Sequence, residues 1–490
     1  MKISLPVPKE VSRITKTLEN AGFEAFIVGG CVRDSLMNRE PKDWDITTKA
    51  TPSEIEALFT KTFYENRFGT VTIVNEDTDD PTLKNVEVTP YRTESEYTDH
   101  RHPDQVHFAE SIEDDLARRD FTINALAYNL DKGQLIDLFG GVADIKDKII
   151  KTVGSPTERF REDALRLLRA VRLATELGFS IDPVTEQAIE AEAGLLGRIS
   201  KERLREEFNK IIMSKRPMMG LQLISKLELL PHVLPDLVPA IGTEQNGDHI
   251  FDVWEHSLRA LQHAAERDFP LHLRLAALFH DIGKPATRRW IKEKNDWTFY
   301  GHEVVGARLV QKIMADLKYP SKTAEVVEKL VRNHMFFVDV DQITLSAVRR
   351  IIAKVGENNV WDLMKLRTSD RIGMGRPKEH PYRLRKYESM IEEALRSPTS
   401  VTMLKIDGND LMNELHVKPG PQIGQILHAL LEEVLDEPTQ NTKEYLLNRA
   451  KDLNELGDKE LAKLAAQGKE KKSETENKEL KKIRQRHGVK

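Results

Sequence analysis

Residues 29–46 read GGCVRDSLMNREPKDWDI, and this stretch decides the fold of the N-terminal region. Asp43 and Asp45 are two residues apart, so on a strand their side chains would point to the same face. Two adjacent carboxylates repel each other unless a cation or a proton intervenes. A pair of Mg²⁺ ions would relieve this repulsion, one lowering the pKa of an attacking hydroxyl and the other holding a triphosphate. The spacing therefore indicates a two-carboxylate metal site.

The residues before this carboxylate pair are suited to bind phosphate. Gly29 and Gly30 follow FEAFIV, a run with the composition of a buried strand, and they allow close approach of a phosphate to backbone N–H groups. Arg33 comes one turn later and could bind a phosphate through two parallel hydrogen bonds. A lone DxD is common in solvated turns, but the glycine pair, the arginine and the two aspartates together favour a functional site.

The first 150 residues have the pattern of a mixed α/β region. Residues 10–20 carry apolar side chains at helical spacing. Short apolar or alternating runs predict strands, and these runs are FEAFIVGG (23–30), DWDIT (43–47), FGTVTIV (68–74) and NVEVTPY (85–91).

From about residue 158 onward the pattern is helical. It predicts one amphipathic helix over residues 160–177 and another over 201–213 with Ser200 as its N-cap. Helical periodicity continues through the histidine-rich residues 249–375. The charged end of the chain, from about Asp458, is expected to be a solvated helix or a disordered tail.

Composition limits the class of protein. The chain has 490 residues, of which 39% are hydrophobic and 31% charged, so several domains are expected. No long apolar run predicts a membrane span, the N-terminus lacks a signal-peptide core, and the single cysteine, Cys31, allows no internal disulfide. These features fit a cytoplasmic protein. The net charge of −5 argues mildly against nucleic-acid binding, although local basic clusters such as residues 161–172 can still meet phosphates.

Residues 29–46 resemble the signature motif of class II nucleotidyltransferases, the group that holds bacterial CCA-adding enzymes and poly(A) polymerases. Their catalytic head belongs to the DNA polymerase beta superfamily. The resemblance continues over roughly residues 20–215 through four further motifs in the family's order. These are RRDFTINA (118–125), GGVADI (140–145), EDALRLLRAVR (162–172) and ISKERLREEFNKII (199–212).

This resemblance implies roles for individual residues. Asp43 and Asp45 would bind Mg²⁺, while Gly29, Gly30 and Arg33 would hold the triphosphate of CTP or ATP. The residues that would surround the ribose are Arg118, Arg119, Asp120 and Asn124.

Asp163 and Arg166 would act as an amino-acid template that reads the Watson–Crick edge of the incoming C or A. If they lie at i and i+3 of one helix they share a face, and they offer acceptors and donors that match C or A but not G or U. Without the flanking motifs, an ordinary surface ion pair would be the better interpretation.

Two further features bear on the head. Glu87 could be a third carboxylate near the metals or a structural residue. Residues 97–104, YTDHRHPD, resemble the flexible loop of CCA-adding and A-adding members, which CC-adding members lack, so a pure CC-adding enzyme is disfavoured.

A second set of motifs resembles the HD phosphohydrolase superfamily, which is all-helical. The motifs are WEHSL (254–258), LFHDIGKP (278–285), GHEVVGA (301–307), VRNHM (331–335) and RTSDRIG (367–373). The resemblance implies that His256, His280, Asp281 and Asp370 bind a metal ion and that His302 and His334 bind a second one. Imidazole and carboxylate ligands suit Mn²⁺, Ni²⁺ or Fe²⁺, and Mg²⁺ less well. Lys284 could assist a phosphate, and the substrates would be phosphate esters such as 2′,3′-cyclic phosphates on RNA ends.

The expected fold class is α+β, with a mixed-sheet head followed by helical domains. The expected domains are a nucleotidyltransferase head (1–150), a helical neck and body for nucleotide selection and RNA binding (151–240), an HD domain (241–376) and a helical tail (377–490). The expected function is CCA addition to tRNA from CTP and ATP. The alternatives are an A-adding enzyme, a poly(A) polymerase, an HD hydrolase whose N-terminal region only docks RNA, and a non-catalytic RNA-binding protein.

Overall fold

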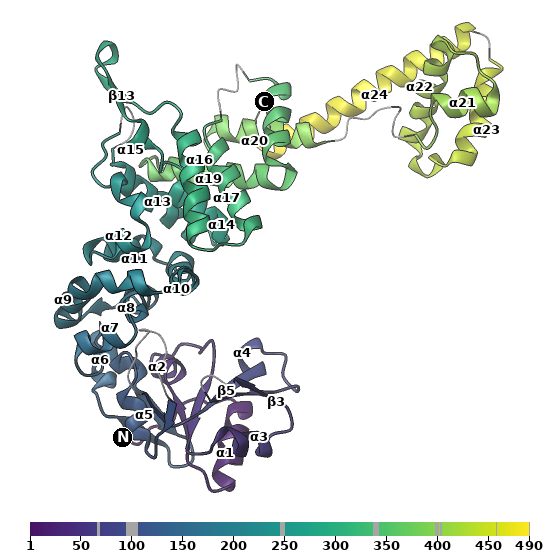
Figure 1. Ribbon diagram of the computed structural model, residues 1–490. Helices are drawn as coiled ribbons and strands as arrows, with labels where there is room; N and C mark the ends of the chain where they lie inside the picture. The colour runs from purple at the N-terminus through teal and green to yellow at the C-terminus, as the bar shows by residue number, and fades with distance from the viewer. Residues whose placement is uncertain are drawn as a thin grey trace. The chain divides into compact units, whose positions relative to one another are not determined.

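The computed structural model describes residues 1–65, 69–94, 106–245, 250–336, 343–396, 401, 404–456 and 458–489. It divides into two compact units, each with its own contacts. The first comprises Met1–His334 with Ser369–Pro377, and the second comprises Met335–Thr368 with Lys378–Lys490. Figure 1 shows strands gathered near the N-terminus and helices through the rest of the chain, which confirms the predicted α+β class. No helix within these ranges is long and apolar enough to cross a membrane.

A mixed seven-stranded sheet forms the centre of the N-terminal region. In spatial order its strands are β3 (Thr62–Glu65), β4 (Thr70–Val74), β5 (Asn85–Pro90), β2 (Asp45–Thr48), β1 (Ala25–Val28), β8 (Leu126–Asn129) and β9 (Gln134–Asp137). The pair β2 and β5 is parallel, and the other neighbours are antiparallel. The four predicted strand regions all lie in this sheet. The parallel pairing brings the beginnings of β2 and β5 to the same edge.

Helices cover this sheet with apolar faces. On α1 (Lys9–Asn20), Val11, Ile14 and Leu18 recur at helical spacing and pack into one core with Ile27 of β1 and Ile46 of β2. The other elements of this region are α2 (Gly30–Leu36), α3 (Pro52–Leu58), α4 (Pro81–Lys84), β6 (Arg92–Glu94), β7 (Val106–Phe108), α5 (Ile112–Ala117), η1 (Thr122–Asn124), α6 (Gly141–Asp147) and β10 (Ile149–Ile150).

The predicted helix over residues 160–177 is wrong, because the chain forms two helices there. They are α7 (Pro156–Glu162) and α8 (Leu165–Leu177), and Asp163 between them has extended φ and ψ angles of −138° and 104°. Oδ1 of Asp163 accepts a hydrogen bond from the backbone N–H of Leu165 at 3.0 Å. Aspartate side chains compete in this way with the helical hydrogen bonds of the backbone, so the helix restarts after residue 163.

More helices follow the α7–α8 junction. The helix α10 (Lys201–Met213) has the predicted bounds, and Ser200 is its N-cap residue, although its side chain makes no capping hydrogen bond. The neighbouring elements are β11 (Ser180–Ile181), α9 (Pro183–Glu192), η2 (Ala193–Arg198), α11 (Pro217–Lys226), α12 (Leu230–Val233) and η3 (Pro235–Ala240).

The histidine-rich region is helical, with one exception. Its helices are α13 (Val253–Glu266), α14 (Leu271–Phe279), α15 (Lys284–Thr287), α16 (His302–Asp316), α17 (Ser321–Asn333) and α19 (Glu357–Gly373). The exception is an antiparallel hairpin of β12 (Arg289–Ile291) and β13 (Asp296–Thr298), with η4 (Lys292–Lys294) in its turn. This hairpin was not predicted. Asn295 has a positive φ of 46°, and asparagine followed by aspartate is a turn signal that could have revealed it.

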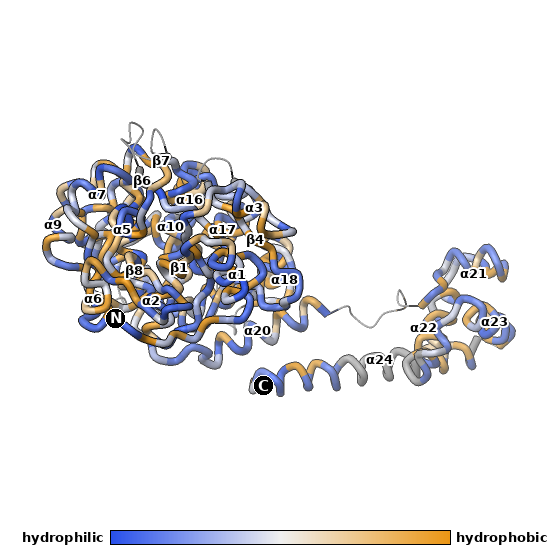
Figure 2. Tube along the Cα trace, turned by 90° about the horizontal axis from the view of Figure 1, so that it is seen from below, coloured by the Kyte–Doolittle hydropathy of each residue, from blue (hydrophilic) through white to orange (hydrophobic). Residues whose placement is uncertain are grey.

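The second unit contains a separate apolar core. Leu411 of α21 (Gly408–Leu415), Ile426 and Leu430 of α22 (Pro421–Asp436), and Leu446 of α23 (Lys443–Asn454) are all buried in it. Figure 2 shows hydrophobic residues in orange on α22 beside these helices. The unit also contains α18 (Leu345–Val355), α20 (Tyr382–Leu395), η6 (Pro438–Gln440) and α24 (Asp458–Arg486). The charged end of the chain is thus a helix, one of the two predicted alternatives.

Candidate functional sites

A cavity of about 570 Å³ lies between the sheet edge and the helices that follow it. It is lined by all eleven residues predicted for the head, namely Gly29, Gly30, Arg33, Asp43, Asp45, Arg118, Arg119, Asp120, Asn124, Asp163 and Arg166. Residues far apart in the sequence therefore share one polar chamber.

Three carboxylates meet at one side of this cavity. Asp45 begins β2 and lies opposite Glu87 on the parallel strand β5. Asp43 precedes the strand rather than lying on it, which corrects the prediction that a strand places both aspartates. Burial, and then the negative charges of Asp43 and Glu87, raise the pKa of Asp45 to about 7, while Arg119 opposes the shift. A cation would relieve this concentration of charge, so the residues fit a bound divalent metal.

The backbone at Gly29 closely approaches the carboxylates. Gly29 has a positive φ of 80°, which a side chain would strain. A Cβ atom there would lie 3.0 Å from Nη1 of Arg119 and 3.8 Å from Oδ2 of Asp45. Glycine at this position keeps the space next to Asp45 open.

A chain of buried polar contacts crosses the floor of the cavity. Arg33 Nη1 donates to Asn124 Oδ1 at 2.6 Å, and Asn124 Nδ2 donates to Asp120 Oδ1 at 3.2 Å. Asp120 also accepts from Nε of Arg169 at 2.8 Å. Although burial alone raises the pKa of Asp120, the guanidiniums of Arg169 and Arg166 hold it well below its usual value. Hydrogen bonds therefore join Arg33, predicted to bind phosphate, to Asn124 and Asp120, predicted to surround the ribose.

Asp163 and Arg166 face the same cavity with different partners. Asp163 Oδ2 accepts from Nη2 of Arg203 at 2.7 Å. Arg166 Nη1 donates to the carbonyl oxygen of Arg159 at 3.1 Å, and its Nη2 donates to that of Arg118 at 3.3 Å. Neighbouring groups thus orient both side chains.

The predicted site residues do not include five further cations that line this cavity, namely Arg92, Arg169, Arg172, Arg203 and Lys210, although Arg169 and Arg172 belong to the basic cluster at residues 161–172 that was expected to meet phosphates. Arg169 stands three residues after Arg166 on α8, a spacing that could have placed it on the same face. Arg203 and Lys210 come from α10, so only tertiary packing brings them here.

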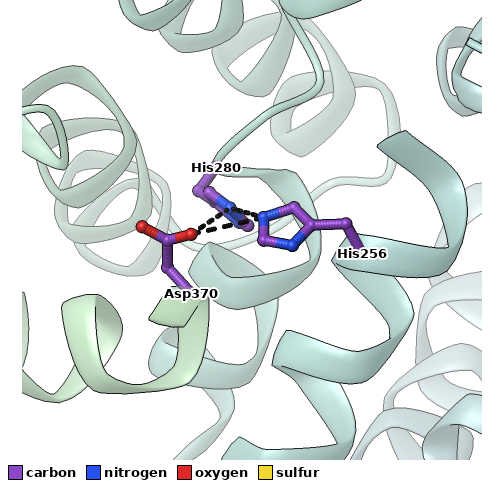
Figure 3. Close-up of side chains that lie close together, drawn as sticks. All are labelled: His256, His280 and Asp370. Carbon is purple, nitrogen blue, oxygen red and sulfur yellow. Dashed lines mark hydrogen bonds and ion pairs between the residues drawn. The ribbon is translucent and has the colours of Figure 1, made fainter. Parts of the chain in front are cut away.

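The six predicted ligands of the HD region lie together and are buried. Figure 3 shows the rings of His256 and His280 converging with Asp370. The two Nε2 atoms are 2.9 Å apart, and they lie 3.3 and 3.6 Å from Oδ1 of Asp370. Each group comes from a different helix or helix end, with α13, α14 and α19 contributing one residue each.

A second group adjoins the first through Asp281. Its Oδ1 lies 3.3 Å from Nε2 of His302 and 3.6 Å from Nε2 of His334, and those two nitrogens are 3.2 Å apart. Oδ2 of Asp281 lies 3.2 Å from Nε2 of His256. The two oxygens of Asp281 therefore face different sets of ligand atoms.

The histidine rings are oriented by the backbone. Nδ1 of His280, His302 and His334 lies 2.8, 2.8 and 2.7 Å from a main-chain carbonyl oxygen three residues earlier. Nδ1–H donates to that oxygen, which leaves the Nε2 lone pair directed at the centre, as metal-binding histidines require. Burial alone would lower the pKa of His280, but Asp281 and Asp370 raise it to about 10. These two carboxylates therefore favour a positive charge at His280, whereas burial lowers the pKa of His334.

Lys284 closes one side of this pocket. Its Nζ donates to Oδ2 of Asp281 at 2.7 Å and to Gln245 Oε1 at 2.6 Å. Lys284 was predicted to assist a phosphate, whereas its partner Gln245 was not predicted.

The fold and these two sites define a class of protein, a nucleotidyltransferase head joined to an HD domain. Residues 25–151 match the poly A polymerase head domain family, residues 178–241 the family described as a probable RNA and SrmB-binding site of polymerase A, and residues 247–372 the HD domain family.

Curated relatives define the family more closely. The chain is 33% identical over 441 residues to the CCA-adding enzyme of Pediococcus pentosaceus, covering 90% of this chain and 96% of the relative. It is 34% identical over 463 residues to that of Limosilactobacillus reuteri, covering 93% and 100%. The chain belongs to the CCA-adding enzyme family, as its motifs predicted.

Solved structures agree with this assignment. The crystal structure of the Bacillus stearothermophilus CCA-adding enzyme in complex with CTP is 28% identical, with a TM-score of 0.59 over 90% of this chain and 97% of that one. The Thermotoga maritima CCA-adding enzyme complexed with tRNA shares the fold at 19% identity, with a TM-score of 0.50.

Proposed function

We propose that this protein adds C, C and A to tRNA 3′ ends from CTP and ATP. One observation carries the proposal: a single cavity joins the carboxylates Asp43 and Asp45 to the pair Asp163 and Arg166, in a chain whose relatives over nearly its whole length are CCA-adding enzymes. A hydrolase whose head only docks RNA would need no such concentration of carboxylates beside a phosphate-binding turn.

The carboxylates Asp43 and Asp45 would hold Mg²⁺, with Glu87 beside them. Bound Mg²⁺ supplies charge neutralisation for the triphosphate and a lower pKa for the attacking 3′-OH. The oxygen of that hydroxyl forms a bond to the α-phosphorus, the bond to pyrophosphate breaks, and the proton passes to solvent. The open backbone at Gly29 and Gly30 admits the triphosphate, and Arg33 binds it.

Nucleotide choice would come from the residues at the α7–α8 junction. Asp163 supplies hydrogen-bond acceptors and Arg166 supplies donors, a combination that satisfies the mixed edges of C and A. Arg118, Arg119, Asp120 and Asn124 surround the ribose. Since Arg203 and the carbonyl of Arg118 already orient the template side chains, they lose little conformational freedom when the base binds.

The proposed function also assigns a role to each domain of the chain and implies where the protein acts in the cell. The head (1–150) would transfer nucleotides, the neck and body (151–240) would select them and bind RNA, and the tail (377–490) would meet the tRNA. Recognition of the acceptor stem should rely on shape and phosphate, because an A-form helix displays little readable sequence in its deep groove. A single cysteine, which allows no internal disulfide, and a tRNA substrate support a cytoplasmic location.

A second activity is favoured by the HD pocket. Two groups of buried ligands that share Asp281 suit two adjacent metal ions, for which Mn²⁺, Ni²⁺ or Fe²⁺ are better matched than Mg²⁺. Such a centre would hydrolyse phosphate esters, including 2′,3′-cyclic phosphates on RNA ends, with Lys284 binding a phosphate oxygen. The loop at residues 97–104, which is expected to distinguish CCA-adding and A-adding members from CC-adding members, lies outside the described residues.

Replacement of Asp43 by Ala tests the main proposal. Labelled CTP incorporation into tRNA lacking CCA should be lost, while hydrolysis of a phosphodiester by the HD domain should remain. Asp77→Ala is the matched control, because the side chain of Asp77 is 91% exposed and lies outside the cavity lining. Unchanged incorporation in Asp43→Ala would exclude the head as the site of transfer.

A further inference from the structure

The hairpin of β12 and β13 is connected at both ends to the HD pocket. It begins after Lys284, whose Nζ contacts Asp281, and it ends before His302, whose Nδ1–H donates to the carbonyl oxygen of Phe299 at 2.8 Å. Figure 1 shows the hairpin, labelled β13, extending beyond α15. The base of the hairpin therefore lies next to the pocket, where Nζ of Lys284 is 5.6 Å from the ring centroid of Phe299.

The composition of this segment differs from that of an ordinary hydrolase surface loop. Residues 288–300 read RRWIKEKNDWTFY, with four cationic side chains, two anionic ones and four aromatic rings. Two of the chain's five tryptophans are here. Interleaved basic and aromatic residues are the combination that binds single-stranded nucleic acid, through phosphate contacts and base stacking.

Two of the aromatic rings form a cross-strand pair on the hairpin. Trp290 and Trp297 are cross-strand partners with ring centroids 5.1 Å apart and planes at 73°. The guanidinium of Arg288 lies 3.8 Å from the centroid of Trp297. Arg288 and Trp297 thus stabilise the hairpin, and Trp290 is left 47% exposed at its edge.

Tyr300 is a further exposed aromatic residue, and it follows the hairpin in the sequence. Its side chain is 73% exposed, it stands two residues before the ligand His302, and Nζ of Lys294 donates to its hydroxyl at 3.0 Å. Arg289 and Lys292 are also exposed on the hairpin. Large exposed aromatics beside cations need a partner that is flat, apolar and negatively charged, which describes a nucleotide chain.

We propose that the β12–β13 hairpin binds the single-stranded 3′ end of RNA, with bases stacked on Trp290 and Tyr300 and phosphates held by Arg289, Lys292 and Lys294. It would thereby present the terminal phosphate to the HD pocket. This inference rests on the proposed hydrolase function of that pocket, whose substrate class it narrows to single-stranded RNA ends.

The test compares two substrates of the full-length, metal-loaded protein. One is a short oligoribonucleotide ending in a 2′,3′-cyclic phosphate, and the other is bis(p-nitrophenyl) phosphate, which has no bases. Trp290→Ala and Tyr300→Ala should each raise KM for the RNA by about 5- to 100-fold, the loss expected for one stacked base. The kcat for RNA and all constants for the small ester should be unchanged, and Trp290→Phe should restore KM.

Tyr382→Ala is the matched control, because Tyr382 is also an exposed aromatic residue beside a cation but lies on α20 and not on the hairpin. It is 41% exposed, and its ring centroid is 5.9 Å from the guanidinium of Arg385. It should leave both substrates unaffected. An unchanged KM for RNA in Trp290→Ala and Tyr300→Ala would overturn the proposal. The proposal would also be overturned if a polyglutamate peptide inhibited RNA hydrolysis by the wild type but not by Trp290→Ala, while the KM for RNA was the same in both proteins. The surface would then bind an acidic protein.

A second measurement separates this inference from the hydrolase activity itself. With EDTA present, a 4-thiouridine oligoribonucleotide should crosslink on irradiation to residues 289–300, and Trp290→Ala should reduce the yield. If wild-type protein hydrolyses neither substrate but these crosslinks form, the hydrolase proposal fails and the docking surface stands. If crosslinks form only in the head, the docking surface is disproved.

Discussion

Nη2 of Arg203 lies 2.7 Å from Oδ2 of Asp163. Arg203 belongs to α10, whereas Asp163 occupies the extended junction between α7 and α8. A contact between residues forty positions apart in sequence therefore orients the carboxylate that we propose reads the incoming base.

Replacement of Arg203 by Ala should lower kcat/KM for CTP and ATP by about 10- to 100-fold, because a hydrogen bond to a charged group contributes roughly 1.5–3 kcal/mol. Misincorporation of UTP or GTP should rise relative to CTP, and Arg203→Lys should recover part of the loss. Arg161→Ala is the control, since its side chain is 64% exposed and pairs with Glu192. An equal loss of kcat/KM for all four nucleotides would show that Arg203 has only a structural role.

The sequence predicted that Asp163 and Arg166 belong to the nucleotide site, but not how their side chains are held. Asp163 and Arg166 were identified from their motif, and both line the cavity. The reasoning that one helix places them was wrong, because Asp163 has extended backbone angles and its Oδ1 accepts a hydrogen bond from the backbone N–H of Leu165, so α7 and α8 are separate helices. Helical periodicity continues across this junction in the sequence, so only the local hydrogen bond reveals the break.

Asp45 should make the stability of the metal-free protein depend on pH. Its folded-state pKa of about 7 exceeds the ordinary value of about 3.9, so the folded state binds the proton more tightly. The resulting stabilisation is complete below about pH 4 and is lost as the pH rises through about 7. In EDTA at pH 8, Asp45→Asn should be more stable than wild type by at least about 1 kcal/mol.

Thermal unfolding from pH 4 to pH 8 checks this expectation. Added Mg²⁺ should raise the unfolding temperature of wild type at pH 8 but not that of Asp45→Asn. Asp77→Asn, at a side chain that is 91% exposed, should follow the wild-type profile. If the unfolding temperatures of wild type and Asp45→Asn changed with pH in the same way, the charge of Asp45 would not destabilise the metal-free folded state.

Glu87 shows why the carboxylate cluster was only partly predictable. Its position opposite Asp45 depends on the register of β5 against β2. This register pairs residues that are 42 positions apart in the sequence, such as Thr47 and Thr89. Local alternation predicts that each strand exists but not which strand pairs with which. The cations that α10 brings to the cavity were missed because only tertiary packing brings them there.

Replacement of Asp281 should affect both metal ions of the HD pocket. Because its two oxygens face different ligand groups, Asp281→Asn should lower the content of both ions, whereas Asp370→Asn should mainly affect the ion bound by His256 and His280. Elemental analysis of the purified variants measures this. Labelled CTP incorporation should be unchanged in both, since neither residue lines the head cavity. Equal metal loss in both variants would argue against separate groups.

Gly283→Ala should destabilise the HD pocket. An added Cβ would lie 2.2 Å from the carbonyl oxygen of His302 and 2.6 Å from the nitrogen of Gly306, so α15 and α16 would have to separate. The cost should be about 1–3 kcal/mol, with weaker metal binding. Gly197→Ala, which has nothing within 4 Å, should change stability by less than about 0.5 kcal/mol. Unfolding midpoints and metal titration together test this, and a neutral Gly283→Ala would contradict the close packing.

The most direct test of the central claim is incorporation of labelled CTP and ATP, separately and together, with Mg²⁺. The substrates are tRNAs that end at the discriminator base, at CC and at CCA. We expect CTP alone to extend the first tRNA, ATP alone to extend the second, both nucleotides to complete CCA, and the third tRNA to remain unextended. Addition of A to the CC end without any use of CTP would contradict CCA addition and identify an A-adding enzyme. Continued addition of A beyond CCA would identify a poly(A) polymerase.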